Sequence, residues 1–399
     1  MIGDVRFSPD FCALARPRRL GVRGLVRGLV LGLAGGLLAA CGGATGQVAQ
    51  TAAPGGPDSG RLRVTGSAEL QVDPSSEAAL SPDGRWLVHA ADHKRVCVQP
   101  VDGGADRCSK ADSAPVPEGY RWSPDSTIVV FTDSWSRNAR EPDLYLLRVA
   151  SMAVSSLTPD ERANLYGDER PGNADVFGQP GPDGRVHFLR VTGADAQGGV
   201  EPCSIAVGGG AVNCGTPTPV GLRRLADADW SHDGRRLAYL DLDPASEVST
   251  LHVLGTDGRE QWSRPAPDPK QAWVRVAFSA DDRYLLLSGA VGATGPPAAV
   301  VVPAGGGDPV PVSRDPAASF PTWSPTGSAL AFGSAPTPGS PRAPTGLWLV
   351  SAPGAAARQI SDRRLAPLGT HDFRLAWGGD RLVGRDAGTA AVVVFRLTA

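Results

Sequence analysis

The stretch LSPDGRWLVHA at residues 80–90 decides the fold, because versions of it recur along the chain. Four further copies are clear: WSPDSTIVVFT from Trp122, WSHDGRRLAYL from Trp230, FSADDRYLLLS from Phe278 and WSPTGSALAFG from Trp323. Two more are degraded: GPDGRVHFLRV from Gly181 and WGGDRLVGRDA from Trp377. The turns begin at residues 81, 123, 181, 231, 279, 324 and 378, with spacings of 42, 58, 50, 48, 45 and 54. Repeats of this length with a strand-turn-strand core indicate the four-stranded blades of a β-propeller.

Each part of the repeat has a physical role. An aromatic residue such as Trp122 or Trp230 ends the inner strand, where it can pack between neighbouring blades. In the Ser-Pro-Asp-Gly turn, Pro presets φ, Asp bonds back to the chain, and Gly accepts a positive φ. An apolar strand follows, and a third strand comes later in most repeats, as in DLYLLRV from Asp143 and TLHVLGT from Thr250. The repeats therefore predict an all-β fold.

These copies resemble the TolB-like propeller repeat, a relative of the WD repeat, over nearly all of residues 61–399. In that family the turn motif is structural. The resemblance therefore implies a β-propeller and transfers no catalytic residue.

Seven copies predict seven blades. The strand AAVVVFRL at residues 390–397 runs almost to the chain end, whereas RLRVTGS at residues 61–67 precedes the first turn. We expect Arg61–Val64 to pair with the carboxyl-terminal blade, which closes the ring and removes two exposed sheet edges. The alternative is a six-bladed ring in which the irregular stretch around residues 160–200 is an insertion.

Two pairs of cysteines have matching spacing. Cys97 and Cys108 are eleven residues apart, as are Cys203 and Cys214, and each pair brackets a Gly-containing turn. Opposed hairpin strands bring two Cα atoms to about the 5.5 Å that a disulfide needs, and such bonds persist in oxidising compartments. A zinc site is the alternative, but structural zinc sites normally contain closely spaced C-x₂₋₄-C pairs, which neither pair has. We therefore expect two disulfides.

The amino terminus has the layout of an export signal. Arginines without an intervening acidic residue precede the apolar run GLVLGLAGGLLAA at residues 28–40: Arg16, Arg18, Arg19, Arg23 and Arg27. This 13-residue run is shorter than the roughly 20 residues of a transmembrane helix. The sequence Leu38-Ala39-Ala40-Cys41-Gly42 resembles the lipobox of bacterial lipoproteins. That resemblance implies cleavage before Cys41 and a diacylglycerol thioether on its sulfur.

The resulting organisation has three parts. Residues 1–40 are expected to be the signal peptide, with a translation start that could lie after the extension at residues 1–15. Residues 41–60 are small and polar and indicate a flexible, lipidated tether. Residues 61–399 would form the propeller. The alternative for Cys41 is an ordinary thiol beside a signal-peptidase site.

The composition excludes some functions. Gly and Pro number 50 and 36, and 41% of the 399 residues are hydrophobic, which fits many short strands around a sizeable core. The net charge of −2 gives no reason to expect a nucleic-acid partner. No G-x-S-x-G nucleophile elbow occurs, so we predict no catalytic residue and no cofactor.

The histidines do not form a motif. They are His89, His93, His187, His232, His252 and His371. Three fall within expected strands, and His232 replaces the Pro of the turn. A metal site would need histidines of distant blades to converge, so we expect no metal.

The acidic segment DERANLYGDERPGNAD at residues 160–175 is the longest departure from the repeat. Its carboxylates are candidates for a binding loop that holds a cation or a basic partner: Asp160, Glu161, Asp168, Glu169 and Asp175. Interspersed arginines weaken a cation site, and a solvated loop between blades is the favoured alternative.

Together these features predict an extracytoplasmic, membrane-anchored binding or scaffold protein. The membrane contact would be the diacylglycerol on Cys41, and the partner an envelope protein or glycan bound by a monomeric propeller. The alternative is a propeller enzyme, a polysaccharide lyase or hydrolase, with its site at the central channel. That alternative would need carboxylates or histidines that converge at the channel.

Overall fold

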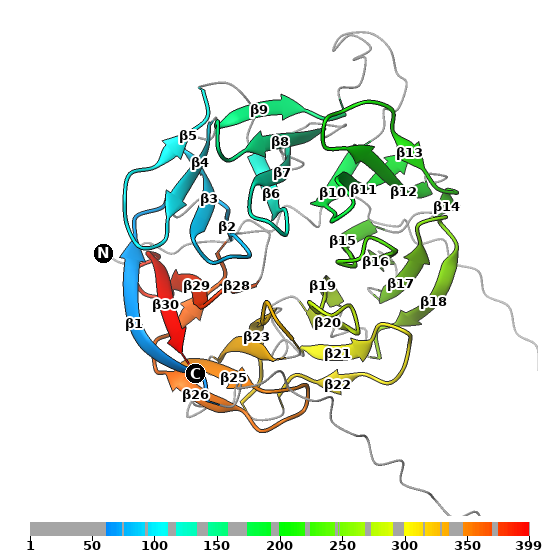
Figure 1. Ribbon diagram of the computed structural model, residues 1–399. Coiled ribbons are helices and arrows are strands. Elements are labelled where there is room, and N and C mark those ends of the chain that lie inside the picture. The colour runs from blue at the N-terminus through cyan, green and yellow to red at the C-terminus, as the bar shows by residue number, and fades with distance from the viewer. Residues whose placement is uncertain are drawn as a thin grey trace, which may run out of the picture. The chain divides into compact units, whose positions relative to one another are not determined.

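The fold is seen in a computed structural model. It describes residues 61–398 except for 74–75, 92–94, 111–116, 134–142, 159–173, 193–198, 220–223, 244–245, 247, 268–272, 290–298, 314–315, 328, 335–345 and 369–373. The described residues form thirty β-strands in seven antiparallel sheets, and no helix occurs among them. The sheets stand as blades around a central axis (Figure 1). The prediction of a seven-bladed propeller is confirmed, and the six-bladed alternative is wrong.

The first three blades are given from the axis outward. Blade 1 consists of β2 (Ala78–Leu80), β3 (Trp86–Ala91), β4 (Arg95–Pro100) and β5 (Arg107–Cys108). Blade 2 consists of β6 (Pro117–Trp122), β7 (Ile128–Asp133), β8 (Leu144–Arg148) and β9 (Ala153–Ser156). Blade 3 consists of β10 (Ala174–Pro180), β11 (Arg185–Thr192), β12 (Gly199–Ala206), β13 (Asn213–Cys214) and β14 (Thr218–Pro219).

The next three blades have the plain four-stranded order. Blade 4 consists of β15 (Arg224–Trp230), β16 (Arg236–Leu242), β17 (Ser249–Gly255) and β18 (Glu260–Pro265). Blade 5 consists of β19 (Trp273–Phe278), β20 (Tyr284–Gly289), β21 (Val300–Pro303) and β22 (Val310–Pro311). Blade 6 consists of β23 (Ser319–Trp323), β24 (Leu330–Ser334), β25 (Gly346–Val350) and β26 (Arg358–Ser361).

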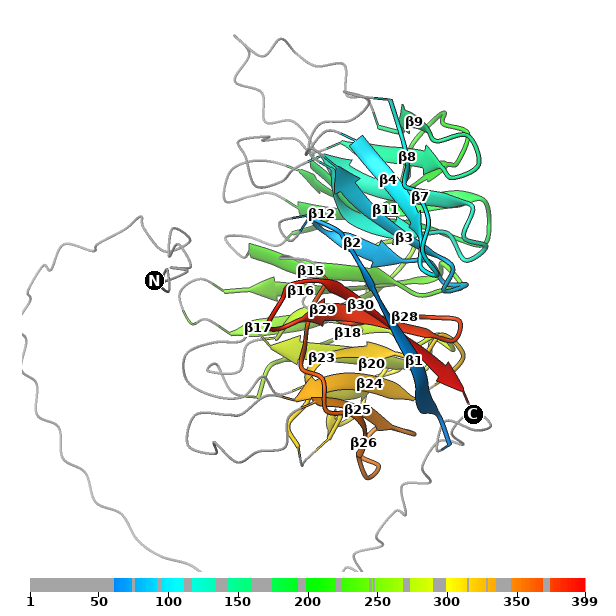
Figure 2. The ribbon, with the colours of Figure 1, turned by 90° about the vertical axis from the view of Figure 1, so that its left-hand side faces the viewer.

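Blade 7 closes the ring with strands from both ends of the described chain. It consists of β27 (Leu365–Ala366), β28 (Ala376–Gly378), β29 (Arg381–Asp386), β30 (Val392–Thr398) and β1 (Arg63–Leu70). β1 pairs antiparallel with β30, from Arg63 opposite Thr398 to Leu70 opposite Val392. Figure 2 shows the two strands side by side. The predicted pairing of the two ends is confirmed, although the pairing extends to residue 70 rather than stopping at Val64.

A shared hydrogen-bond network shapes the repeated turn. In blade 1 the Ser81 hydroxyl donates to Asp83 and accepts the backbone N–H groups of Arg85 and Trp86. The Asp83 carboxylate also accepts the Arg85 N–H, at 3.0 Å. The same bonds recur in blades 2 and 4 around Ser123 and Ser231, and in blade 5 the Ser279 hydroxyl donates to Asp281 and accepts the Tyr284 N–H. The motif therefore sets the geometry with which each inner strand turns into the next strand.

In blades 1 to 5 the fourth turn position has a left-handed backbone whichever residue occupies it. Gly84 and Gly184 both have φ of 73°, but Ser126 and Asp282 reach 60° and 56° despite their side chains. Both side chains bond the turn of the preceding blade. The Ser126 hydroxyl accepts the Asp83 N–H, and the Asp282 carboxylate accepts the N–H groups of residues 232 and 233. These bonds offset the strained backbone.

The hydrophobic core lies between blades. Val88 and Val98 of blade 1 pack with Trp122 and Val129 of blade 2, and the other blade pairs share similar clusters. The indole nitrogen of Trp122 donates to the Ala79 carbonyl at 3.1 Å, and that of Trp323 donates to Ala277 at 3.2 Å. The predicted packing of these aromatic residues between blades is confirmed.

Disulfides join the third and fourth strands of blades 1 and 3. Cys97 lies directly opposite Cys108 across β4 and β5, and Cys203 opposite Cys214 across β12 and β13. Both bonds are formed, with Cα atoms 4.0 Å apart in each. The prediction of two hairpin disulfides is confirmed.

Gly84 tests the contact that joins blade 1 to blade 7. A Cβ atom on Gly84 would lie 2.2 Å from the Gly378 carbonyl oxygen, whereas one on Gly184 would have open space. Gly184→Ala adds backbone strain alone and should lower the free energy of unfolding by about 1 kcal/mol. Gly84→Ala adds a clash with rigid backbone, so we expect a loss of about 2–5 kcal/mol. Urea unfolding followed by tryptophan fluorescence measures both, and equal losses would contradict this account of the closure.

The disulfide of blade 3 should contribute measurably to stability. Replacing Cys203 and Cys214 together by Ser removes a cross-link between residues eleven apart, which restrains the unfolded chain. We expect the free energy of unfolding to fall by about 2–3 kcal/mol. Thiol titration of the denatured, unreduced wild-type protein supplies the control, because the four cysteines of the two disulfides, Cys97, Cys108, Cys203 and Cys214, should not react. Titration of free thiols at Cys203 and Cys214 would refute the bond.

Candidate functional site

Most carboxylates of the predicted binding loop lie outside the described residues: Asp160, Glu161, Asp168 and Glu169. Cys41 lies outside them as well. Asp175 is described, and it belongs to strand β10 rather than to a loop. Its buried carboxylate accepts two hydrogen bonds of 2.8 Å from the Arg190 guanidinium. Asp175 therefore helps to hold blade 3 together.

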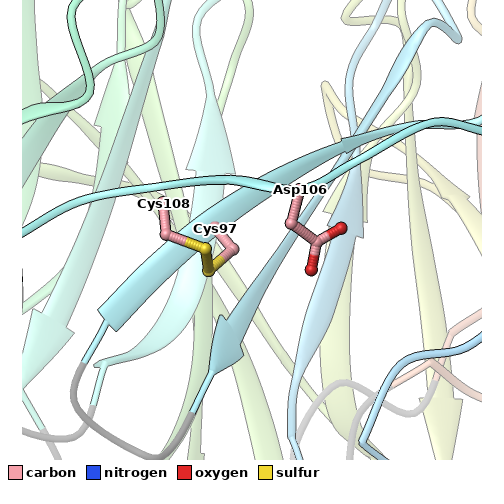
Figure 3. A group of neighbouring side chains, drawn as sticks. All are labelled: Cys97, Asp106 and Cys108. Atoms are coloured by element: carbon pink, nitrogen blue, oxygen red, sulfur yellow. A yellow bond between two sulfur atoms is a disulfide. The ribbon is translucent and has the colours of Figure 1, made fainter.

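Two groups of potential metal ligands occur among the described residues, and both include a disulfide. In one, Cys97 and Cys108 lie near Asp106, as Figure 3 shows; the other joins Glu201 to Cys203 and Cys214. The sulfur atoms are bonded to each other, so they cannot act as thiolate ligands. The zinc alternative for these cysteines is therefore not supported.

A cavity of about 440 Å³ lies where the inner strands of all seven blades converge. Each blade contributes the residue that stands two positions before its repeated turn. We call these seven residues the inner ring: Ala79, Arg121, Gln179, Asp229, Ala277, Thr322 and Ala376.

The described part of the chain contains no helix with the length and hydrophobicity of a membrane span.

The inner ring is asymmetric. Blades 2, 3 and 4 contribute Arg121, Gln179 and Asp229, which are adjacent around the axis. Blades 5, 7 and 1 contribute alanine, and blade 6 contributes threonine. Because the seven positions are equivalent in the repeat, this difference gives the inner ring one side of large polar side chains and one side of small side chains.

Two polar members of the inner ring tie neighbouring blades together. The Gln179 amide accepts the N–H of Trp230 and donates to its carbonyl oxygen. Asp229 accepts the N–H of Phe278 at 2.7 Å. In both cases the bonded residue directly precedes the turn of the next blade. These side chains hold the inner strands at a fixed separation.

Arg121 does not have this structural role. The residue of blade 3 that corresponds to Trp230 and Phe278 is Pro180, which has no N–H to satisfy. Among the described residues, no hydrogen bond is made by the Arg121 side chain, although the guanidinium lines the cavity and is half-buried. It is therefore available to bind an anionic group.

Electrostatics connect this arginine to the neighbouring groups. Burial raises the pKa of Asp229, and the positive charges of Arg121 and Arg374 and the N–H of Phe278 counteract that rise only in part. Arg374, from blade 7, also lines the cavity. A hydrogen bond to Asp282 raises the pKa of His232, which lies at the same cavity. The site thus combines a guanidinium group with a carboxyl and an imidazole whose pKa values are both raised.

Tyr120, a residue of the cavity lining, has a buried hydroxyl. Its side chain is 5% exposed, and the hydroxyl has no hydrogen-bond partner among the described residues. Burial raises the pKa of Tyr120 well above its usual value, so the hydroxyl stays protonated.

The inner-ring residues were missed as site candidates by sequence reasoning, which took the repeats as structural and turned to the acidic loop. Aligning the seven copies would have revealed the signal, because the position two residues before the turn is Ala in three blades and Arg, Gln or Asp in three others. Arg374 and Tyr120 carry no such signal. Their placement depends on how the inner strands converge.

Comparisons with known proteins extend to the fold. No family model matches the sequence, and no curated protein matches it. Among solved structures, the β-propeller domain of Cps50 (Swd1) from Myceliophteria thermophila is 10% identical, with a TM-score of 0.51 over 84% of this chain and all of that one. Hydrazine synthase from Kuenenia stuttgartiensis is 14% identical, with a TM-score of 0.52 over 83% and 98% of the two chains.

A third structure is similar to the same degree. Oligogalacturonate lyase in complex with manganese is 10% identical, with a TM-score of 0.58 over 83% of this chain and 93% of that one. These proteins differ in what their names describe, so the likeness establishes the architecture they share. The chain has a seven-bladed β-propeller fold.

Proposed function

We propose that this protein is a lipid-anchored, extracytoplasmic binding protein whose ligand enters the central cavity. One observation carries the proposal. Every blade contributes a residue to the inner ring of the cavity, and its three large polar members, Arg121, Gln179 and Asp229, come from three adjacent blades. Gln179 and Asp229 tie neighbouring blades, but Arg121 makes no such bond among the described residues, so blade packing alone does not account for its place at the cavity.

Three features support the location. The Arg-rich and apolar segments before residue 41 have the layout of an export signal, and the residues around Cys41 resemble a lipobox. The two disulfides suit an oxidising compartment outside the cytoplasm. In this proposal the diacylglycerol on Cys41 holds the protein at the membrane, and residues 41–60 act as a tether. The ligand would come from the envelope, from a protein or a glycan.

A second candidate function is a propeller enzyme, a polysaccharide lyase or hydrolase. Two titratable groups of blade 4, Asp229 and His232, line the same cavity, and each has a raised pKa. A carboxyl group and an imidazole at one cavity are residue types that enzymes use for general acid–base catalysis. Among the described residues that line the cavity, Asp229 is the one with a carboxyl group and His232 the one with an imidazole. The enzyme candidate therefore rests on a single pair of titratable groups.

Replacing Cys41 tests the anchor. We expect the wild-type protein, made in a bacterial host, to partition with membranes and to carry a diacylglycerol group by intact mass. Cys41→Ala should lose both the added mass and the membrane association, because the sulfur is the attachment atom. Cys12→Ala is the matched control and should behave as the wild type. A wild-type protein that is cleaved without lipid, or that is not exported, would contradict the proposal.

Replacing Asp229 distinguishes binding from catalysis. Asn can still accept the Phe278 N–H, so Asp229→Asn should fold while losing the proton-transfer group. We expect neither the wild type nor this variant to release unsaturated or reducing ends from polysaccharides. The control is Asp308→Asn, at an exposed carboxylate. Turnover by the wild type that Asp229→Asn abolishes and Asp308→Asn retains would favour the enzyme. A carboxyl of raised pKa should then act as the acid, with activity falling as pH rises through that pKa.

A further inference from the structure

Blade 1 brings several metal-binding groups together on one face of its sheet. His89 of β3 lies opposite Cys97 of β4, and Cys97 lies opposite Cys108 of β5. Residues directly opposite each other in antiparallel strands point to the same face, so the imidazole and both sulfur atoms share one face. Asp106, just before β5, adds a carboxylate (Figure 3). The ligand atoms of Asp106 and the two cysteines lie within 4.8 Å of one another.

The imidazole of His89 is arranged as a metal ligand would be. His89 is 4% exposed, and its Nδ1 lies 3.3 Å from the Ala90 carbonyl oxygen, which can only accept, so Nδ1 carries the proton. In the neutral ring Nε2 then has a lone pair. This nitrogen is buried and makes no hydrogen bond with a described residue. A metal-binding histidine usually has one ring nitrogen bonded to a carbonyl or carboxylate in this way, with the other nitrogen on the metal.

The contact between His89 and Asp106 favours a cation at this place. The Nε2 atom lies 3.3 Å from Asp106 Oδ2, yet no hydrogen bond joins the two atoms. A lone pair and a carboxylate oxygen at this distance repel each other unless a positive charge lies beside them. Two ligand atoms on one tetrahedral zinc ion are about 3.4 Å apart, because each of their bonds to zinc is about 2.1 Å long. The two groups therefore have the separation of zinc ligands.

Blade 3 provides a comparison within the chain. Its disulfide has the same register, with Cys203 opposite Cys214, and the Glu201 carboxylate lies near both sulfur atoms. The residue opposite Cys203 on the other side is Phe188, which has no ligand atom. The hairpin of blade 1 thus offers two sulfurs, an oxygen and a nitrogen, whereas the hairpin of blade 3 lacks the nitrogen.

The oxidation state of the cysteines decides whether blade 1 can bind a metal. In the disulfide the two sulfur atoms are bonded to each other, and neither is a thiolate. A dithiol reductant opens this bond: the dithiol becomes a disulfide, and its two electrons and two protons convert Cys97 and Cys108 to thiols. A divalent cation then displaces both protons into the solvent and binds two thiolates. Two sulfurs, one nitrogen and one oxygen suit tetrahedral Zn²⁺.

We propose that blade 1 contains a zinc site that forms when the Cys97–Cys108 disulfide is reduced, with His89 and Asp106 as the other two ligands. The reduced chain is the state that precedes disulfide formation, so zinc holds β5 against β4 before the covalent bond exists. This site goes beyond the proposed function, because it depends neither on the central cavity nor on lipidation of Cys41. It gives a role to a buried histidine that the repeated turn does not use.

Cobalt(II) in place of zinc reports the thiolate ligands, because a thiolate gives Co²⁺ charge-transfer absorption bands. The test uses the full chain with Cys12→Ala and Cys41→Ala, so that every remaining cysteine belongs to one of the two hairpins. A phosphine reduces the disulfides without adding a thiolate, and it becomes a phosphine oxide with oxygen from water. We expect the reduced protein to bind one equivalent of Co²⁺ with these bands, and Zn²⁺ to displace it. The unreduced protein should show no such bands.

Paired substitutions in this background locate the site. Cys97→Ser with Cys108→Ser should weaken Co²⁺ binding by at least about tenfold, whereas Cys203→Ser with Cys214→Ser should leave it unchanged. Equal binding by the two hairpins, or binding that survives only in blade 3, would overturn the proposal. A reduced protein that gives no bands would overturn it as well.

Single substitutions test the other two ligands. His89→Phe installs the side chain that blade 3 has at this position, and Asp106→Asn changes a partly exposed carboxylate. Each should weaken Zn²⁺ binding by at least about tenfold, measured by competition with a chromophoric chelator. The matched control is Asp308→Asn, at an exposed carboxylate between β21 and β22.

Thermal unfolding supplies a readout that is independent of absorption. The disulfide form of each variant should unfold cooperatively, which establishes that the variant folds. In the reduced form, Zn²⁺ should raise the Tm of the parent protein more than that of His89→Phe or Asp106→Asn, because a ligand that binds the folded state stabilises it. If both variants fold and bind zinc as the parent does, His89 and Asp106 are not ligands and the assignment is wrong.

Discussion

The packing of blade against blade is the constraint on which the rest of this structure depends. Each blade of this propeller has apolar side chains on both faces, and it can bury both faces only against its two neighbours. Blade 1 packs against blade 2 through Val88 and Val98, and against blade 7 through Leu80 and Leu87. No blade has a core of its own, so the ring must close for any blade to be fully covered. Closure also forces the seven inner strands together at the axis.

This convergence makes the repeat a source of chemical variety at one place. The turn residues repeat because they set a strand connection that every blade needs. Two residues before the turn lies the inner-ring position, where the residues of all seven blades line one cavity. At this position the fold requires only that neighbouring inner strands be bonded to each other. Gln179 and Asp229 meet that demand with side chains. At the first and fifth blades the tie comes instead from an indole of the following blade. Arg121 is exempt because Pro180 needs no acceptor.

Separation along the sequence decides which features could be predicted and which could not. The turn motif, the hairpin cysteines and the two end strands are local patterns, and they predicted seven blades, two disulfides and closure between the ends. The site escaped prediction because its members come from separate blades, as with Arg121 and Arg374, which are 253 residues apart. Asp175 misled for a different, local reason. Its partner Arg190 lies across a hairpin in blade 3, whose copy of the repeat has Pro180 in place of an aromatic residue.

The strand order of blade 7 also fixes a sequence of events during synthesis. β1 is the first described strand to leave the ribosome and β30 is the last, yet they pair from Arg63 opposite Thr398. Blades 1 to 6 can assemble from neighbouring segments as they emerge. Blade 7 must bring together residues far apart in the sequence, and it therefore carries the entropic cost of closing a very long loop. Until then β1 is an unpaired edge of eight residues. A nascent chain that ends before the seven residues of β30 contains nearly all of this sequence, but the pairing of β1 with β30 that closes the ring cannot form.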